Sequence, residues 1–250
     1  HRMADGTPYT DAVLTTRDEW TDKPGALSDS VIDAIRKRFN IGWWGVSLRL
    51  YGREEVNKAA YAVLEKAMND IGPMLIKPTS WRKGEPVERS GWTGTPITFP
   101  MQNVNWYGGR GGHIGFSPIL PQDGSAALAQ FQRTYARYRE YGMDYQGSFA
   151  FGERHLINVN AMIFNKDDPA MMARIDPFFR ALVADAKAQG YGEYRTHLDY
   201  MDLVAGSYDW NGGALRKLNE KVKDALDPNG ILAPGKSGIW GSAHAGERGQ

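Results

Sequence analysis

Tyr194 and Arg195, inside the run GEYRTH, are the two adjacent side chains best suited to act on one ligand. In the middle of a strand such neighbours face opposite ways, whereas at a strand end or bend both can reach one pocket. A phenol hydroxyl and a guanidinium together can stabilise an oxyanion, such as a phenolate, through charge-assisted hydrogen bonds. A surface arginine beside a core tyrosine gives the same pattern, so the pair alone leaves both interpretations open.

Residues 107–118, YGGRGGHIGFSP, contain five glycines in twelve positions. Because glycine lacks Cβ and tolerates positive φ, such a loop lets the backbone approach a ligand closely. The run matches neither G-x-G-x-x-G nor the P-loop, so a generic flexible loop is also open. His113 within it could be a base, a metal ligand or a surface residue. The five histidines lack H-x-x-x-H spacing, so we predict no metal site.

The run LDPNGILAPGKSGIW, residues 226–240, brackets three residues of strand potential with two turn clusters. This is more rigid turn chemistry than a solvated tail needs. Lys236, on the Gly-flanked turn, could point at a carbonyl, an electron-rich ring or a phosphate. Two tight turns that close the fold are the structural alternative.

Composition excludes several classes of protein. Thirty basic and twenty-nine acidic residues leave a net charge of +1, which favours neither nucleic acid nor an anionic membrane as a partner. The absence of cysteine excludes disulfides and thiolate catalysis. No apolar run approaches the roughly 18 residues of a membrane span. Composition leaves the compartment undecided. A start at His1 without signal-peptide character predicts a cleaved chain or a segment of a longer one.

Periodicity predicts the elements that must position these residues. The rhythm of strand and helix indicates an α+β fold, an antiparallel sheet with helices on one face. We expect strands at Trp43–Leu50, Ile114–Phe116, Tyr145–Phe151 and Leu156–Phe164. We expect helices that begin after Ser28 or Asp29, at 54–70, at 126–141, from a cap at Asp167 or Asp168 to Gln189, near Asp199, and at 214–226.

The motifs together resemble the vanillyl-alcohol oxidase and p-cresol methylhydroxylase flavoprotein family of FAD enzymes that oxidise 4-alkylphenols. The run DPNGILAPGK resembles the family's C-terminal signature, and GEYRTH and YDWN resemble its phenol-oxidising branch. The resemblance implies a cap domain plus the C-terminal piece of the FAD-binding domain. The expected division is an irregular segment at 1–40, a cap or substrate-binding domain at 41–190, the FAD-domain portion at 191–240, and a disordered tail at 241–250.

This resemblance implies FAD-dependent oxidation of para-substituted phenols, by hydride transfer from the benzylic carbon through a quinone methide. Tyr194 and Arg195 match the catalytic pair that binds the phenolic oxygen. Ser148 matches a pocket-facing position where relatives carry a small polar or acidic residue.

The cofactor implied is FAD, covalently attached. His113 resembles the histidine that links to the flavin, and Tyr107 is the alternative because methylhydroxylases use a tyrosine. Lys236 resembles the lysine near the flavin pyrimidine ring.

The family's N-terminal FAD-binding half has no counterpart in this sequence. We therefore expect that half as a separate or cleaved chain, together with a phenolic substrate, a homo-oligomer, and oxygen or a cytochrome as electron acceptor. The compartment stays open: the cytoplasm is favoured, or the periplasm if a cytochrome is the acceptor. Two alternatives stay open: a 2-hydroxy-acid oxidase or dehydrogenase of the same superfamily, and a non-catalytic module that binds small aromatics.

Overall fold

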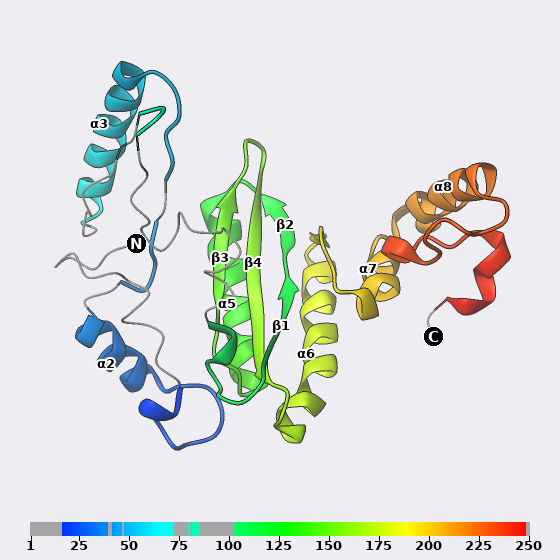
Figure 1. Ribbon diagram of the computed structural model, residues 1–250, viewed down its shortest axis with the longest axis horizontal. Helices are drawn as coiled ribbons and strands as arrows, with labels where there is room; N and C mark the ends of the chain where they lie inside the picture. Colours follow the sequence, from blue (N-terminus) through cyan, green and yellow to red (C-terminus); the bar gives the residue numbers. More distant parts are fainter. Residues whose placement is uncertain are drawn as a thin grey trace. The chain divides into compact units, whose positions relative to one another are not determined.

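The computed structural model describes residues 17–39, 42–46, 48–72, 80, 82–85 and 103–248. The chain divides into two compact units, one formed by His1–Thr21 and Leu27–Asn103, the other by Asp22–Ala26 and Val104–Gln250. The expected domain boundaries, after residues 40 and 190, do not coincide with this division and stay predictions. Figure 1 shows the elements of both units along the chain.

The described part of the first unit contains two α-helices and a short 3-10 turn. The helices α2 (Asp29–Phe39) and α3 (Glu54–Asp70) follow η1 (Arg17–Glu19) and lie where the periodicity predicts helices. The predicted strand at Trp43–Leu50 is wrong, because residues 42–46 and 48–50 form no strand. Val46 is 60% exposed and Leu48 57%, so their alternation does not mark a buried face.

A five-stranded antiparallel sheet organises the second unit. Its strands are β1 (Gly111–Phe116), β2 (Pro118–Pro121), β3 (Gly147–Phe151), β4 (His155–Asn165) and β5 (Gly192–Glu193). The long β4 pairs with β3 on one side and with β1 and β2 on the other, and β5 pairs with the outer edge of β2. Phe116 lies opposite Asn160 and Ile119 opposite Ile157, so β1 and β2 continue one register across Ser117.

Helices α5 (Gly124–Glu140) and α6 (Pro169–Ala188) pack against each other and against β4. The carboxylates of Asp123 and Asp168 accept hydrogen bonds from the first backbone N–H groups of these helices, which fixes where each begins. Even-numbered residues of β1 and β4 are buried together with the apolar stripe of α6. Odd-numbered residues lie on the opposite face of the sheet. The α+β fold with helices on one face is confirmed.

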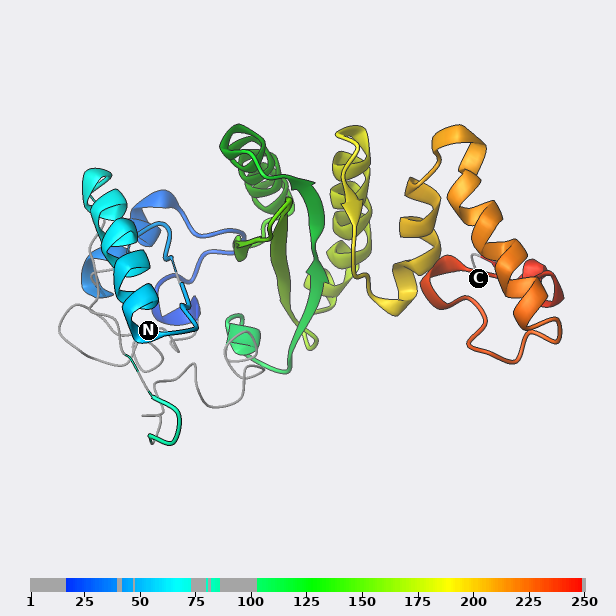
Figure 2. The same cartoon turned by 90° about the horizontal axis from the view of Figure 1, so that it is seen from above.

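Beyond the sheet, η3 (Leu198–Tyr200), α7 (Met201–Ser207) and α8 (Trp210–Leu226) follow β5, and the turns η4 (Lys236–Gly238) and η5 (Ser242–Glu247) follow α8. Figure 2 shows α6, α7 and α8 following one another away from the sheet. Residues 211–213 adopt left-handed conformations, so the regular part of α8 begins at the predicted Ala214. No helix among the described residues is long and apolar enough to cross a membrane.

Residues 241–250 are expected to form a disordered tail, but the structure shows an ordered segment through residue 248. Residues 242–247 form η5, and the backbone N–H of Ser242 donates to Asp224 Oδ1 at 2.6 Å. Arg248 pairs with Glu220 of α8. Polar contacts with α8 therefore order a glycine-containing segment whose composition suggested a solvated end.

Candidate functional site

Four segments of the second unit enclose a groove of about 380 Å³. This volume is in the range of pockets that hold small organic ligands. The walls combine apolar side chains with hydroxyl and cationic groups. They comprise the end of β5 (Glu193, Tyr194, Arg195, Thr196), α7 and its end (Met201, Val204, Ala205, Tyr208), α8 (Leu215, Arg216, Asn219), and the η4 turn (Lys236, Ser237, Gly238, Ile239).

Tyr194 and Arg195 both line this groove. Strand β5 ends at Glu193, so the pair lies beyond the alternation of the strand and both side chains reach the same space. The Arg195 guanidinium carbon lies 5.5 Å from the centre of the Tyr194 ring, within reach of a cation–π contact. The two donors that the sequence suggested for an oxyanion are therefore neighbours in space.

The backbone before the pair is held by Tyr208. Its hydroxyl donates to the carbonyl oxygen of Glu193 at 2.9 Å. A Cβ on Gly192 would lie 2.3 Å from this hydroxyl, so only glycine lets the tyrosine approach. The runs GEYRTH and YDWN, which are apart in sequence, thus form one contact that fixes the strand end.

The terminal run has two distinct halves. In the first, the buried Asp227 carboxylate accepts hydrogen bonds from the backbone N–H groups of Ile231 and Leu232 and from Lys223 Nζ, at 3.0, 2.9 and 2.6 Å. The hydrogen bond from Lys223, backed by those from the backbone, lowers the pKa of Asp227. This half closes a turn and contributes no groove residue.

The second half, the APGKSG turn, brings Lys236 to the groove. Ala233, Gly235 and Ser237 have positive φ values of 43°, 73° and 56°. Two of these residues are not glycine, and such strained backbone persists only where the surroundings hold it. The Ser237 N–H donates to Met201 Sδ at 3.2 Å, and Trp240 Nε1 donates to Asp202 Oδ1 at 2.7 Å, so the turn is tied to α7.

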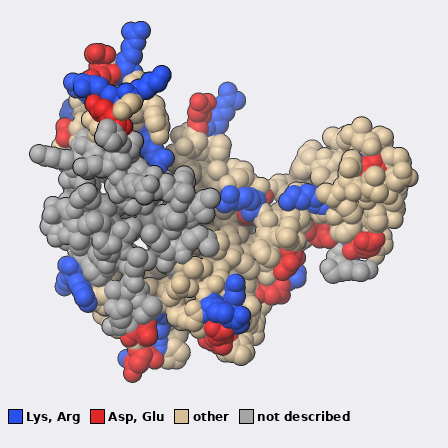
Figure 3. Space-filling view, viewed as in Figure 1, with Lys and Arg blue, Asp and Glu red and all other residues tan. Residues whose placement is uncertain are grey.

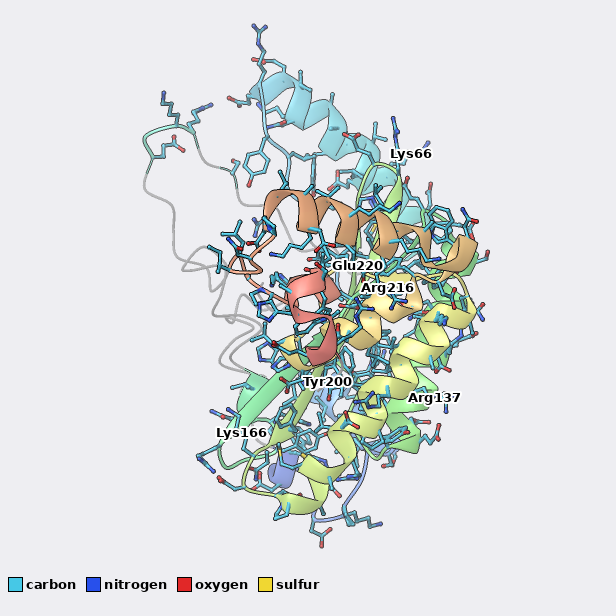
Figure 4. All side chains as sticks on the ribbon, turned by 90° about the vertical axis from the view of Figure 1, so that its right-hand side faces the viewer. Lys66, Arg137, Lys166, Tyr200, Arg216 and Glu220 are labelled. Atoms are coloured by element: carbon cyan, nitrogen blue, oxygen red, sulfur yellow. The ribbon has the colours of Figure 1, made fainter. Side chains whose placement is uncertain are left out.

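The groove is cationic. Arg195, Arg216 and Lys236 line it, and no carboxylate of a described residue forms an ion pair with Arg195 or Lys236. Arg216 Nε lies 3.9 Å from Glu220 Oε1, a loose pair. In Figure 4 both residues lie on the side of α8 that faces α7 and the C-terminal turns. The arrangement suits an anionic ligand with an apolar body.

Sequence reasoning missed two charged residues of the groove, Glu193 and Arg216. Glu193 is only 5% exposed, and burial raises the pKa of its carboxyl to about 8. A carboxylate at the end of a buried strand was a usable signal, since the polar run around it is unusual for such a strand. Arg216 carried no such signal, because its pattern matches any charged residue of a surface helix.

Three predicted residues lie outside the groove. His113 is exposed on β1 opposite Ile163, and Ser148 is exposed on β3 opposite Val159. Both belong to the face of the sheet that α5 and α6 leave open. Their partner residues on β4, Ile163 and Val159, are four positions apart along that strand. Tyr107 packs against the core, and its hydroxyl accepts a hydrogen bond from the Asp144 N–H at 2.6 Å. The structure therefore groups Tyr194, Arg195 and Lys236 and leaves these three residues apart from them.

Comparison with known protein families matches residues 88–237 to the model described as FAD linked oxidases, C-terminal domain. The flavoprotein subunit of 4-cresol dehydrogenase (hydroxylating) from Pseudomonas putida is 30% identical over 227 residues, which are 90% of this chain and 43% of that protein.

Two solved structures resemble the chain closely. The 4-ethylphenol oxidase from Gulosibacter chungangensis in complex with isoeugenol aligns with a TM-score of 0.79 at 29% identity, over 94% of this chain and 46% of that one. The p-cresol methylhydroxylase with substrate bound aligns with a TM-score of 0.75 at 30% identity, over 93% and 45%. The chain thus spans less than half the length of these relatives.

Proposed function

Because this chain belongs to the family of FAD linked oxidases that share this C-terminal domain, we propose that it takes part in the FAD-dependent oxidation of para-substituted phenols. The observation that carries the proposal is the meeting of Tyr194, Arg195 and Lys236 in one groove. The names of the relatives above, which refer to 4-cresol and 4-ethylphenol, support a phenol as the substrate.

Arg195 and Tyr194 hold the phenolic oxygen and favour its ionised form. A guanidinium and a hydroxyl donate to an oxyanion more strongly than to a neutral phenol, so the pair lowers the free energy of the phenolate. Its negative charge delocalises toward the para carbon and weakens the benzylic C–H bond toward loss of hydride. FAD, when bound, supplies the hydride acceptor. The substrate is left as a quinone methide, to which water adds, giving an alcohol.

The groove residues fit one edge of FAD. A space of about 380 Å³ accommodates a phenol ring but not a dinucleotide, so the groove itself holds only a part of the cofactor. Lys236 and Arg216 place positive charge on the walls formed by η4 and α8, where they would stabilise negative charge on the flavin pyrimidine edge. We propose that His113, or Tyr107 in its place, forms the covalent link to the flavin.

The exposed side of α8 supports the proposal that the rest of the FAD-binding domain packs against this chain. Leu215, Leu218, Val222 and Leu226 are spaced along one side of the helix and are exposed, as are Ile231 and Leu232 in the following turn. In Figure 3 the part of the molecule formed by α8 and the C-terminal turns shows few charged side chains on the visible face. The relatives are more than twice as long as this chain, and the part of them that it does not match is a candidate for covering this apolar side of α8.

We propose a separate or cleaved N-terminal half as this partner, and, from the family resemblance, a homo-oligomer that passes electrons to oxygen or a cytochrome. Size exclusion with mass analysis tests the partner. We expect a coloured complex heavier than the 27.9 kDa of the chain. A lone, colourless species of that mass would contradict it.

Replacing Arg195 with Met tests the proposed function. We expect flavin reduction by 4-ethylphenol to slow by about 10²–10³, the usual effect of removing one oxyanion donor. Stopped-flow absorbance measures the rate. Arg154→Met, at the exposed β3–β4 turn, is the matched control and should leave the rate unchanged. Equal rates for both variants would remove the pair from the site.

The three cationic side chains of the groove would also suit a carboxylate, which makes a 2-hydroxy acid the second candidate substrate. Lactate and 4-ethylphenol added separately to the same flavin-loaded protein discriminate between them. We expect bleaching of the flavin by the phenol and none by lactate. Bleaching by lactate alone would favour the hydroxy-acid oxidase, and failure of the protein to load with any flavin would favour the non-catalytic aromatic-binding module.

A further inference from the structure

Glu193 lies between the sheet and the groove. It is the last residue of β5 and pairs with Pro118 of β2, and its carboxyl accepts a hydrogen bond from the Ser117 N–H. Its carbonyl oxygen accepts the hydroxyl of Tyr208 at 2.9 Å. The two residues that follow it are Tyr194 and Arg195, so its side chain and backbone hold the segment from which that pair projects.

One oxygen of the Glu193 carboxyl, Oε1, does not take part in these hydrogen bonds. Oε1 is buried and has no hydrogen-bond partner of good geometry among the described residues, although the Arg195 N–H acts on the carboxyl, and Thr196 Oγ1 in the same wall also lacks a partner there. A buried carboxylate with an unsatisfied oxygen carries a large desolvation cost, whereas the neutral acid avoids most of it. Burial accordingly raises the pKa of Glu193 to about 8, against the opposing effects of the Ser117 and Arg195 N–H groups and of the Arg195 charge.

The charged and titratable groups around Glu193 come from several elements. Strand β2, with the sequence PILP, brings none, and on α6 Lys187 pairs with Asp209. On α7, the Asp202 carboxylate accepts a hydrogen bond from Trp240 Nε1 at 2.7 Å. The other groups are cationic or phenolic: Tyr191, Tyr194 and Arg195 on its own segment, Tyr208 at the end of α7, Arg216 on α8, and Lys236 on η4. Among the groove-lining residues Glu193 is the single carboxyl, so its protonation sets whether the Arg195 charge is neutralised from inside the protein.

We propose that Glu193 is a positioning residue that stays a neutral carboxylic acid, so that the charge of Arg195 is left for an anionic ligand in the groove. This inference rests on the proposed function, with the phenolate as the ligand. As the neutral acid, Glu193 still accepts the Ser117 N–H and holds the strand end. Once ionised, it competes with the phenolate for Arg195. Binding of a phenolate should therefore weaken as the pH rises through the titration of this one group.

The test uses the protein as isolated and pentafluorophenol, a phenol acidic enough to stay ionised throughout. Isothermal titration calorimetry gives its dissociation constant at about pH 6.5 and about pH 9.5, on either side of the Glu193 titration and below that of an ordinary tyrosine. For the unsubstituted protein we expect about tenfold weaker binding at the higher pH, the effect of one added neighbouring charge at a partly exposed site. Glu193→Gln, which is isosteric and cannot ionise, should bind equally at both pH values.

Glu153→Gln, at the exposed β3–β4 turn, is the matched control and should keep the tenfold dependence. Near-UV circular dichroism reports whether Glu193→Gln keeps its native packing. Parallel pH profiles for the unsubstituted protein and Glu193→Gln would overturn the inference and leave the proposed function standing. Absence of phenolate binding at either pH would overturn both. A constant affinity in Glu193→Gln beside a falling one in the unsubstituted protein and in Glu153→Gln would support it.

Discussion

The groove and the open face of the sheet carry the predicted site residues in two different ways. In the groove, the end of β5, α7, α8 and η4 converge, and Tyr194, Arg195 and Lys236 share one space with walls on several sides. On the open face, His113 and Ser148 occupy single positions of β1 and β3, the strands that flank β4, while α5 and α6 pack on the other face. Contacts within this chain therefore shape the groove, whereas the side chains on the open face project from single strands.

The largest effect is expected from removing the proposed flavin link, His113, from the open face. We expect His113→Ala to abolish the acid-stable flavin absorbance completely, because it removes the imidazole that forms the proposed covalent bond. Absorbance of the redissolved acid precipitate measures it. Tyr107→Phe is the matched control and should retain the colour, since the Tyr107 hydroxyl already accepts the Asp144 N–H. Loss of colour only in Tyr107→Phe would assign the link to the tyrosine instead.

The turn closed by Asp227 precedes the groove turn that carries Lys236. Asp227→Asn removes the charge that binds Lys223 and weakens the acceptors for the Ile231 and Leu232 N–H groups. We expect the melting temperature at neutral pH to fall by about 5 °C. Asp176→Asn, in an exposed ion pair with Arg180, should change it by less than about 1 °C.

The same variant has a defined pH dependence. The pKa of Asp227 is lowered in the folded state, chiefly by the Lys223 hydrogen bond, so the folded state favours the ionised carboxylate. Its contribution to stability is complete above the unfolded pKa and is lost as the pH falls through the lowered folded pKa. The difference in melting temperature between the unsubstituted protein and Asp227→Asn should thus shrink in acid. A difference that grew in acid would contradict this account of the turn.

Lys236 tests whether the groove influences the flavin. A positive charge near the pyrimidine edge stabilises the reduced anion, so Lys236→Met should lower the two-electron reduction potential by about 30 mV, a tenfold change in the equilibrium. Equilibration with a reference dye measures the potential. Lys217→Met removes an exposed lysine of α8 outside the groove and should leave the potential unchanged. Equal potentials in both variants would move the flavin edge away from this wall.

The helices and most strands could be predicted because local signals decide them. Asp168 with Pro169 marks the start of α6, and the alternation in Leu156–Phe164 marks β4. Trp43–Leu50 shows the limit of such patterns: alternation describes a strand only when a neighbouring strand satisfies its backbone. The order of the segment after residue 240 was not predicted, because it comes from contacts with α8 that composition does not encode.

The site divides in a similar way. The Tyr194-Arg195 pair could be predicted only together with the family resemblance, because the pair alone also matches a surface arginine beside a core tyrosine. The burial of Glu193 and the position of Arg216 depend on how β5, α7 and α8 meet, which no local pattern specifies. The terminal run was read as one signal but contains two, a structural turn closed by Asp227 and a groove turn that carries Lys236.

Ser148 provides the smallest expected effect and the most direct comparison between the two regions. If the substrate ring extends from the groove donors toward the open face, the Ser148 hydroxyl contributes one neutral hydrogen bond. Ser148→Ala should then raise the KM for 4-ethylphenol by about threefold with kcat unchanged, since such a bond stabilises the bound substrate and the transition state equally. Ser242→Ala, an exposed serine of η5, controls for a generic effect of removing a hydroxyl. An unchanged KM in Ser148→Ala would restrict substrate contacts to the groove, while a fall in kcat alone would mean that the open face acts on the reaction itself rather than on binding.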